Sequence, residues 1–170
     1  FEMPSKVETI GQYAFANCKS LKEIVIPKTA GSVGKSYIGD YTFAHAGVMD
    51  ITSENTVLSN HMFEDNDALE SIIVPELTKV GNYAFFDCDK LNRIEYYDET
   101  LSEGMFKDCS GIEIVFIPTW ITNVYDSVFA DCESLVTVVQ DNGRAVEDSN
   151  SNTGNIGQSM YENDVKLKHL

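Results

Sequence analysis

A short pattern of apolar and small residues recurs along the chain. One copy, residues 80–94, carries an aliphatic residue, a glycine, a phenylalanine, a cysteine and a leucine, and an isoleucine follows the leucine by three positions. Taking that phenylalanine, Phe85, as the anchor, the equivalent positions are Phe15, Phe43, Phe63, Phe106 and Phe129, with Tyr161 as a weaker seventh. The return of the same pattern at each of these anchors predicts a repeat protein. In such a protein each unit buries its apolar face only by stacking on its neighbours.

Two further positions keep a constant distance from the anchor. An aliphatic residue precedes it by five positions, at Ile10, Ile38, Leu58, Val80, Leu101, Val124 and Ile156. A small or compact polar residue follows it by three, at Cys18, Ala46, Asn66, Cys88, Cys109, Cys132 and Asp164. We interpret this second position as a buried turn that accepts only a small volume.

A short strand completes each unit. The alternation in Ile24-Val25-Ile26 is typical of a strand, and Pro27 ends it because proline cannot donate to a β-ladder. The predicted inward pairs are Ile24 and Ile26, Ile72 and Val74, Ile94 and Tyr96, Val115 and Ile117, and Val138 with Gln140. The segment 83–87 is too short for a full helix, so we predict a single helical or 3₁₀ turn on the opposite side of the unit.

The complete pattern is I/V-G-x-x-A-F-x-x-C-x-x-L-x-x-I-x-I-P, and residues 10–27 match every marked position. This pattern resembles the BspA-like leucine-rich repeat family over nearly the whole chain; the second and seventh units depart from it furthest. The resemblance implies an α/β leucine-rich repeat solenoid, with parallel strands on the concave face and short helical or 3₁₀ turns on the convex face. It also implies an extracellular or cell-surface protein of a bacterium or parasitic protist, often an adhesin.

We expect one domain over residues 1–170, with about six full repeats and partial repeats at both ends. Phe1-Glu2-Met3-Pro4 fits the strand end of a preceding unit, so both ends look like cuts through a longer array. The segment 141–155 is polar and nearly free of apolar residues, and we predict an inserted loop there.

The net charge of −15 narrows the choice of partners. Nucleic-acid binding relies on clustered Lys and Arg, so we expect no nucleic acid partner. An acidic surface is also repelled by anionic lipid. No run of about 18 apolar residues is present, and we expect no membrane insertion in this chain. The simplest role of the charge is solubility.

The four cysteines stand at one position per repeat, which indicates structural periodicity and not a zinc site. We predict buried thiols that behave as small apolar residues. The spacing of neighbouring strands, about 5 Å, would also permit a disulfide between Cys88 and Cys109, and the sequence leaves both states open.

Other candidate chemistry is sparse. Residues 148–152 have the opening D-x-N-x-N spacing of a calcium loop, but its glycine and its closing glutamate are missing at Thr153 and Ser159. His45 and His61 flank anchors in the turns, where we expect solvated side chains. No catalytic or phosphate-binding motif appears. We therefore expect no enzyme, no cofactor and no metal.

The remaining candidate is the exposed side of the strands. There we predict a binding face, and its candidate residues are Val25, Ile73, Arg93, Glu95, Tyr97, Ile114, Phe116 and Val139. In particular we expect Phe116 to be flanked by Ile73 and Val139 in an apolar patch of the kind that marks protein-binding sites. Parallel strands also favour β-branched and aromatic residues when no ligand binds to them, so these residues are compatible with an ordinary sheet surface. Trp120 fits either an anchor at the rim of a binding site or a residue packed within a loop.

These residues predict a non-catalytic interaction or adhesion module. Resemblance to the family implies a host or matrix protein or glycan as the partner. The alternative is a structural spacer or self-assembling element, whose ends would stack on one another without any specific ligand.

Overall fold

The structure, a computed structural model, describes residues 1–31, 37–53, 57–74, 79–140 and 155–156. Within these ranges every regular element is a β-strand. The four-residue strands, here called long strands, are β1 (Glu23–Ile26), β2 (Asp50–Ser53), β4 (Ser71–Val74), β6 (Arg93–Tyr96), β8 (Ile114–Ile117) and β10 (Thr137–Gln140). The two-residue short strands are β3 (Val57–Leu58), β5 (Lys79–Val80), β7 (Thr100–Leu101), β9 (Asn123–Val124) and β11 (Asn155–Ile156).

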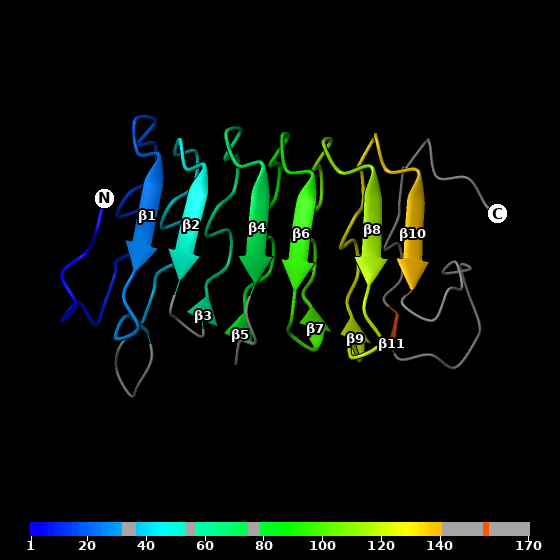
Figure 1. Ribbon diagram of the computed structural model, residues 1–170. Helices are drawn as coiled ribbons and strands as arrows, with labels where there is room; N and C mark the ends of the chain where they lie inside the picture. Colours follow the sequence, from blue (N-terminus) through cyan, green and yellow to red (C-terminus); the bar gives the residue numbers. More distant parts are fainter. Residues whose placement is uncertain (32–36, 54–56, 75–78, 141–154, 157–170) are drawn as a thin grey trace.

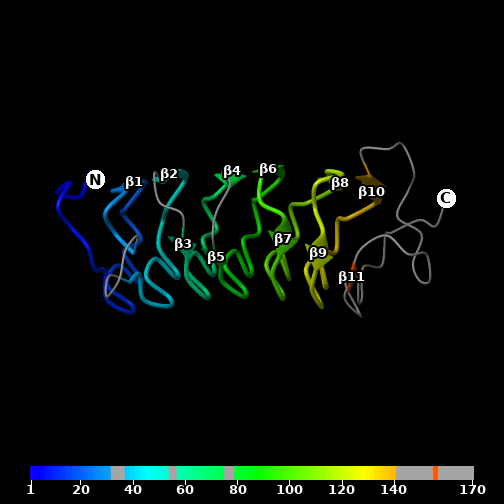
Figure 2. The same ribbon diagram turned by 90° about the horizontal axis from the view of Figure 1, so that it is seen from below.

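The long strands lie side by side in chain order and point the same way (Figure 1). Seen at right angles, they follow one edge of the molecule and the turns follow the opposite edge, with the short strands between them (Figure 2). We call the solvent side of this row the long-strand face. Each unit is thus one coil of chain, and every coil packs against the coils before and after it.

Strand register confirms the alignment of the repeats. Leu58 pairs with Val80, and Leu101 and Ile156 both pair with Val124, as their common position in the repeat predicts. The predicted inward positions of β1, β4 and β8 are buried and the residues between them are exposed. At the start of the chain Glu2 forms an isolated parallel bridge with Val25 and Met3 is buried, so this segment lies beside β1.

Pairing along the row of long strands is interrupted. β1 pairs with β2, β4 with β6 and β8 with β10, all in parallel, but the three pairs belong to separate sheets. Figure 1 shows the wider spaces after β2 and after β6. Each strand ahead of such a space has an inward residue that is only half-buried, Ile51 in β2 and Ile94 in β6.

The prediction of a helical or 3₁₀ turn at each anchor is wrong. Two residues in every turn have left-handed backbone, for example Tyr83 (φ 55°) and Asp87 (φ 57°), which breaks any right-handed helical run. Alternate N–H groups instead donate to the next coil. Tyr83 donates to the Glu103 carbonyl at 2.9 Å, Phe85 to that of Met105 at 3.0 Å and Asp87 to that of Lys107 at 2.9 Å.

This ladder also explains why the row of long strands runs nearly straight in Figure 2 and not along a concave surface. A helix on the far side would be about 10 Å wide against about 4.8 Å for a strand, and that mismatch bends a stack of coils. Here the turn edge is held at strand-like spacing by backbone hydrogen bonds between neighbouring coils, and the long strands pair at a similar spacing within β1–β2, β4–β6 and β8–β10. No wide element on the turn side therefore forces the row to bend.

The anchor phenylalanines form one continuous stack through the core. From Phe15 to Phe129, neighbouring ring centroids are 5.3–5.6 Å apart and the rings lie within 13° of parallel. All the anchors from Phe43 onward are at most 2% exposed, whereas Phe15, in the first coil, is half-buried. Each ring therefore depends on the rings before and after it for its burial.

The position three residues after the anchor supplies a side-chain hydrogen-bond donor in four coils as well as a small volume, whereas Ala46 fills it by volume alone. The thiol of Cys88 donates to the Phe63 carbonyl at 3.2 Å, and that of Cys109 donates to the Phe85 carbonyl at 3.1 Å. Asn66 occupies the same position, and its amide donates to Phe43 at 2.9 Å. Thiol and amide thus both satisfy the anchor carbonyl of the preceding coil, which our volume argument did not foresee.

Aspartates gather along one edge of the turns. Burial, followed by neighbouring carboxylates, raises the pKa of Asp67 and of Asp87 above the ordinary value. The pKa of Asp108 is also raised, chiefly by burial, although Lys107 beside it acts in the opposite direction. Because the folded state binds these protons more tightly than the unfolded chain, ionisation of these groups opposes folding at neutral pH.

We expect Phe85→Ala to lower the free energy of unfolding by about 3–5 kcal/mol, because it opens a cavity in the middle of the ring stack. Urea unfolding followed by circular dichroism measures the loss. Phe116→Ala is the matched control, and since Phe116 is 72% exposed it should cost less than about 0.5 kcal/mol. Equal losses in the two variants would contradict the ring stack as the core.

We expect Asp87→Asn to stabilise the protein at pH 7 and to flatten its pH dependence. The folded-state pKa of Asp87 is raised, so the parent should gain stability as pH falls from neutrality toward the ordinary aspartate pKa of about 3.9. Asparagine suits the left-handed backbone, as Asn17 shows at the equivalent position of the first coil. Thermal unfolding across this pH range, with the exposed Asp126→Asn as control, tests the change; an unaltered slope would speak against it.

Candidate binding face and interior cavity

Large apolar side chains are exposed at one end of the long-strand face. On β8, Phe116 is 72% exposed and Ile114 is 49% exposed, and on β4 Ile73 is 65% exposed. They occupy the outward positions of their strands, because successive side chains of a strand point to opposite faces. The residues between them, Val115 and Ile72, are buried in the core.

The structure corrects the predicted neighbours of Phe116. Phe116 lies opposite Val139 of β10, as expected. On its other side, however, β6 intervenes, and Ile73 pairs with Glu95 of that strand. Glu95 forms an ion pair with Arg93, also on β6. A charged pair therefore separates Ile73 from the apolar group of Phe116, Ile114 and Val139, which we call the β8 patch.

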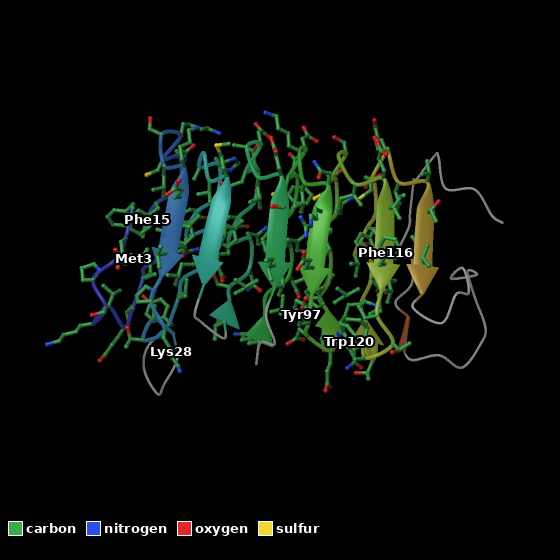
Figure 3. All side chains as sticks on the ribbon, in the orientation of Figure 1. Met3, Phe15, Lys28, Tyr97, Phe116 and Trp120 are labelled. Carbon is green, nitrogen blue, oxygen red and sulfur yellow. The ribbon has the colours of Figure 1, made fainter. Side chains whose placement is uncertain are left out.

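An aromatic pair borders the face at the ends of the strands. The rings of Tyr97 and Trp120 stack with centroids 6.3 Å apart and planes within 5°. They are 51% and 44% exposed, and Figure 3 shows them near the ends of β6 and β8, on the same side of the row as Phe116. Trp120 is thus a residue of the rim and not one packed within a loop.

Val25 is set apart from the other candidates. It is 36% exposed and pairs with Thr52 of β2, at the opposite end of the row from β8. The structure brings together Ile114, Phe116 and Val139, with Arg93, Glu95 and Tyr97 beside them; it leaves Val25 outside that group.

Sequence reasoning missed a cavity between β6 and β8. Its volume is about 560 Å³, and it extends from Arg93 and Phe116 on the face down to the core rings of Phe106 and Phe129. The only hint in the sequence is Tyr96, which replaces the Ile or Val found at the second inward position of β1, β4 and β8. The interruption of the sheet that opens the cavity leaves no sign in the sequence.

Tyr96 forms one wall of this cavity and is held in place by a hydrogen bond. Its hydroxyl donates to the Thr100 carbonyl, and Asp98 accepts from the Thr100 N–H at 2.9 Å. Burial, followed by the nearby Asp98 carboxylate, raises the pKa of Tyr96, so the phenol keeps its proton and remains a donor. The side chain is therefore fixed by its own loop.

The other candidate groups have structural partners. None of the four cysteines forms a disulfide; Cys88, Cys109 and Cys132 are buried as predicted, whereas Cys18, in the first coil, is exposed. Burial raises the pKa of the Cys109 thiol, which keeps it protonated. Contrary to our expectation of solvated histidines, His61 stacks between Tyr41 and Tyr83 and contacts Glu64, and His45 pairs with Asp65. The stacking of successive coils brings these partners together.

Among the described residues no group of three or more His, Cys, Asp or Glu side chains is placed to hold a metal ion. The possible calcium ligands at 148–152 lie outside the described residues, as do His169, Tyr161 and all of the predicted 141–155 loop except Asn155, which begins β11. Nor do the described ranges contain a helix with the length and apolarity that a membrane crossing needs.

Comparison with known proteins identifies the repeats. The family model described as BspA type leucine rich repeat region matches residues 1–57 and 36–168 in six copies. No curated protein gives a significant match. Among solved structures, a T. pallidum leucine rich repeat protein is 22% identical over 82% of this chain and 69% of its own, with a TM-score of 0.62.

A leucine rich cell surface protein from Faecalibacterium prausnitzii A2-165 is also 22% identical, over 80% of this chain, with a TM-score of 0.52. This chain covers 46% of that protein, less than half of its length. At such identity the two structures support the fold alone. Because the family model covers nearly the entire sequence, the chain belongs to the BspA-type leucine-rich repeat family.

Proposed function

We propose that this chain is a non-catalytic module that binds a protein partner through the β8 patch. The observation that carries the proposal is the exposure of Phe116, 72%, on a strand whose inward neighbours are buried. A large aromatic side chain on a rigid strand loses little conformational freedom when a partner covers it. Burying such a side chain fully contributes about 1.5–3 kcal/mol.

The surroundings of Phe116 have the composition of a protein interface. Ile114 and Val139 extend the apolar centre, and the Tyr97–Trp120 pair adds aromatic area at its border. The Arg93–Glu95 ion pair supplies a polar edge on the side of β6. Binding energy in protein interfaces concentrates in central aromatic residues that a polar rim shields from water.

Charge narrows the class of partner. The chain carries a net charge of −15, so a partner with a neutral or basic surface would associate with it fastest. Tyr97 and Trp120 could also stack on the apolar face of a sugar, which makes a glycan the second choice. Host-cell or matrix proteins and glycans are the partners that we propose.

We further propose that the protein acts outside the cell or at its surface. One support is the structural likeness to the F. prausnitzii protein, which is itself described as a cell surface protein. The alternative function, a spacer or self-assembling element, requires only the stacking of coils and gives the exposed side chains of the β8 patch no role.

We expect Phe116→Asp to weaken binding to a matrix protein or glycan by about tenfold to a hundredfold, because a carboxylate then replaces the apolar centre of the contact. Biolayer interferometry against a panel of purified matrix proteins and glycans measures the change. Tyr125→Asp is the matched control, since Tyr125 is also an exposed aromatic, at 55%, but precedes a turn and lies outside the long strands.

Ile73→Asp tests whether the binding site extends beyond the Arg93–Glu95 pair. We expect it to weaken binding less than Phe116→Asp does. Circular dichroism must show that all three variants are folded. If Phe116→Asp and Tyr125→Asp bind equally well, the β8 patch is ordinary sheet surface. Chain growth with concentration in light scattering, without any ligand, would then favour the spacer.

A further inference from the structure

The cavity between β6 and β8 has a floor on the turn side and an opening on the long-strand face. On the turn side the two coils remain joined, because Phe85 donates to the Met105 carbonyl at 3.0 Å and its neighbours form equivalent bonds. On the face β6 and β8 belong to separate sheets. The space therefore opens between Arg93 and Phe116 and is closed below by the rings of Phe106 and Phe129.

Its size suits a small molecule. A volume of about 560 Å³ falls within the range of roughly 300–1,000 Å³ that ligand pockets occupy. Ile114 and Phe116 in its lining are 49% and 72% exposed, whereas Phe106 and Phe129 beneath them are at most 1% exposed. The cavity is therefore an open groove above the ring stack, with room for a ligand.

The shape of the cavity suits a long, unbranched ligand. The walls are residues from the whole of β8 and most of β6, so the cavity follows the strands for their length. A four-residue parallel strand spans about 13 Å, at about 3.3 Å per residue. The width is limited to the space between two neighbouring coils. A narrow slot of this kind admits an extended chain more readily than a fused ring system.

The two ends of the slot differ in polarity. Where the strands begin, the walls carry Asn92, Arg93 and Glu113. Where they end, the walls carry Leu101, Ile117 and Ile121, of which Leu101 is 4% exposed and Ile117 6% exposed. A ligand aligned with this gradient has a polar group at one end and an apolar remainder.

We propose that this cavity binds a single-chain amphiphile, with its polar end beside Arg93 and its apolar chain running along the strands toward Pro118. The occupant is an acyl chain, whether a free fatty acid or the chain of a lipid. It is a ligand in its own right and does not depend on the protein partner of the β8 patch. Phe116 and Ile114 lie at the mouth of the cavity and are the residues that the two sites share.

Calorimetric titration of the protein with dodecanoic acid, below the concentration at which the acid aggregates, tests the site. Ile94 lines the cavity and is half-buried, so Ile94→Phe fills the slot and should weaken binding by about tenfold or more. Ile51→Phe is the matched control. Ile51 is the half-buried inward residue of β2, as Ile94 is of β6, and it lies outside the cavity and two long strands away from Ile94, so binding should change less than about twofold.

The unmodified protein offers a second test that needs no variant. Trp120 is the single tryptophan of the chain, and it stands between Pro118 and Ile121 at the apolar end of the slot. Dodecanoic acid brominated at its terminal carbon should quench the fluorescence of Trp120 more strongly than acid brominated beside the carboxyl group. The proposed orientation predicts this difference.

Displacement of dodecanoic acid by a short-chain phosphatidylcholine, kept below the concentration at which it forms micelles, would identify a lipid as a source of the chain. If the phosphatidylcholine does not displace the acid, the ligand is a free amphiphile. Failure of dodecanoic acid to bind saturably, equal loss in Ile94→Phe and Ile51→Phe, or equal quenching from both bromine positions would overturn the proposal. Ile94→Phe fills the cavity and leaves the residues of the β8 patch unchanged, so loss of acyl-chain binding in that variant can be told apart from loss of partner binding.

Discussion

The backbone ladder between successive turns is the constraint on which the rest of the structure depends. Each coil uses alternate N–H groups for its own turn and the others for the next coil, and this ladder runs from the first coil to the last anchor. It requires left-handed backbone two residues before and two residues after each anchor. The pitch of this ladder sets the spacing at which the phenylalanine rings meet, 5.3–5.6 Å.

The long strands are less constrained than the turns, because they do not all pair with their neighbours. The candidate sites lie where this pairing is interrupted. Because the turns and the ring stack already hold neighbouring coils together, the face can lose pairing after β2 and β6 without separating the coils. At the second of these interruptions the inward side chain is tyrosine, and its hydroxyl is bound within its own loop. The cavity at β6 and the exposed residues of β8 therefore occur side by side.

Acidic side chains are distributed in a way that leaves the β8 patch available. Aspartates at the left-handed positions, Asp65, Asp87, Asp108 and Asp131, follow the turn edge, and the mutual repulsion of this row is partly relieved by Lys107. On the face, Glu95 of β6 is paired with Arg93. Much of the charge that keeps the protein soluble is thus placed away from its candidate binding surface.

The sequence by itself determined the repeat, the strand positions and the side each strand residue faces. The repeat of about 20 residues and the alternation of inward and outward residues along a strand can both be read from the sequence. The pairing of Leu58 with Val80 confirms the first, and the burial of Ile24 and Ile26 confirms the second. Asp and Asn two residues after the anchors also signalled left-handed turns, since these residue types tolerate that backbone, although we predicted a helical turn. Exposure of Phe116 followed from the same alternation.

Only the tertiary structure decided how the coils meet. That His61 lies between two tyrosine rings and that the sheet opens between β6 and β8 both depend on contacts between residues about 20 positions apart. Hydrophobic periodicity reports which way a side chain faces within its own coil. It carries no information on whether the backbones of two neighbouring coils approach closely enough to pair, because that distance is set by the packing of all the side chains between them.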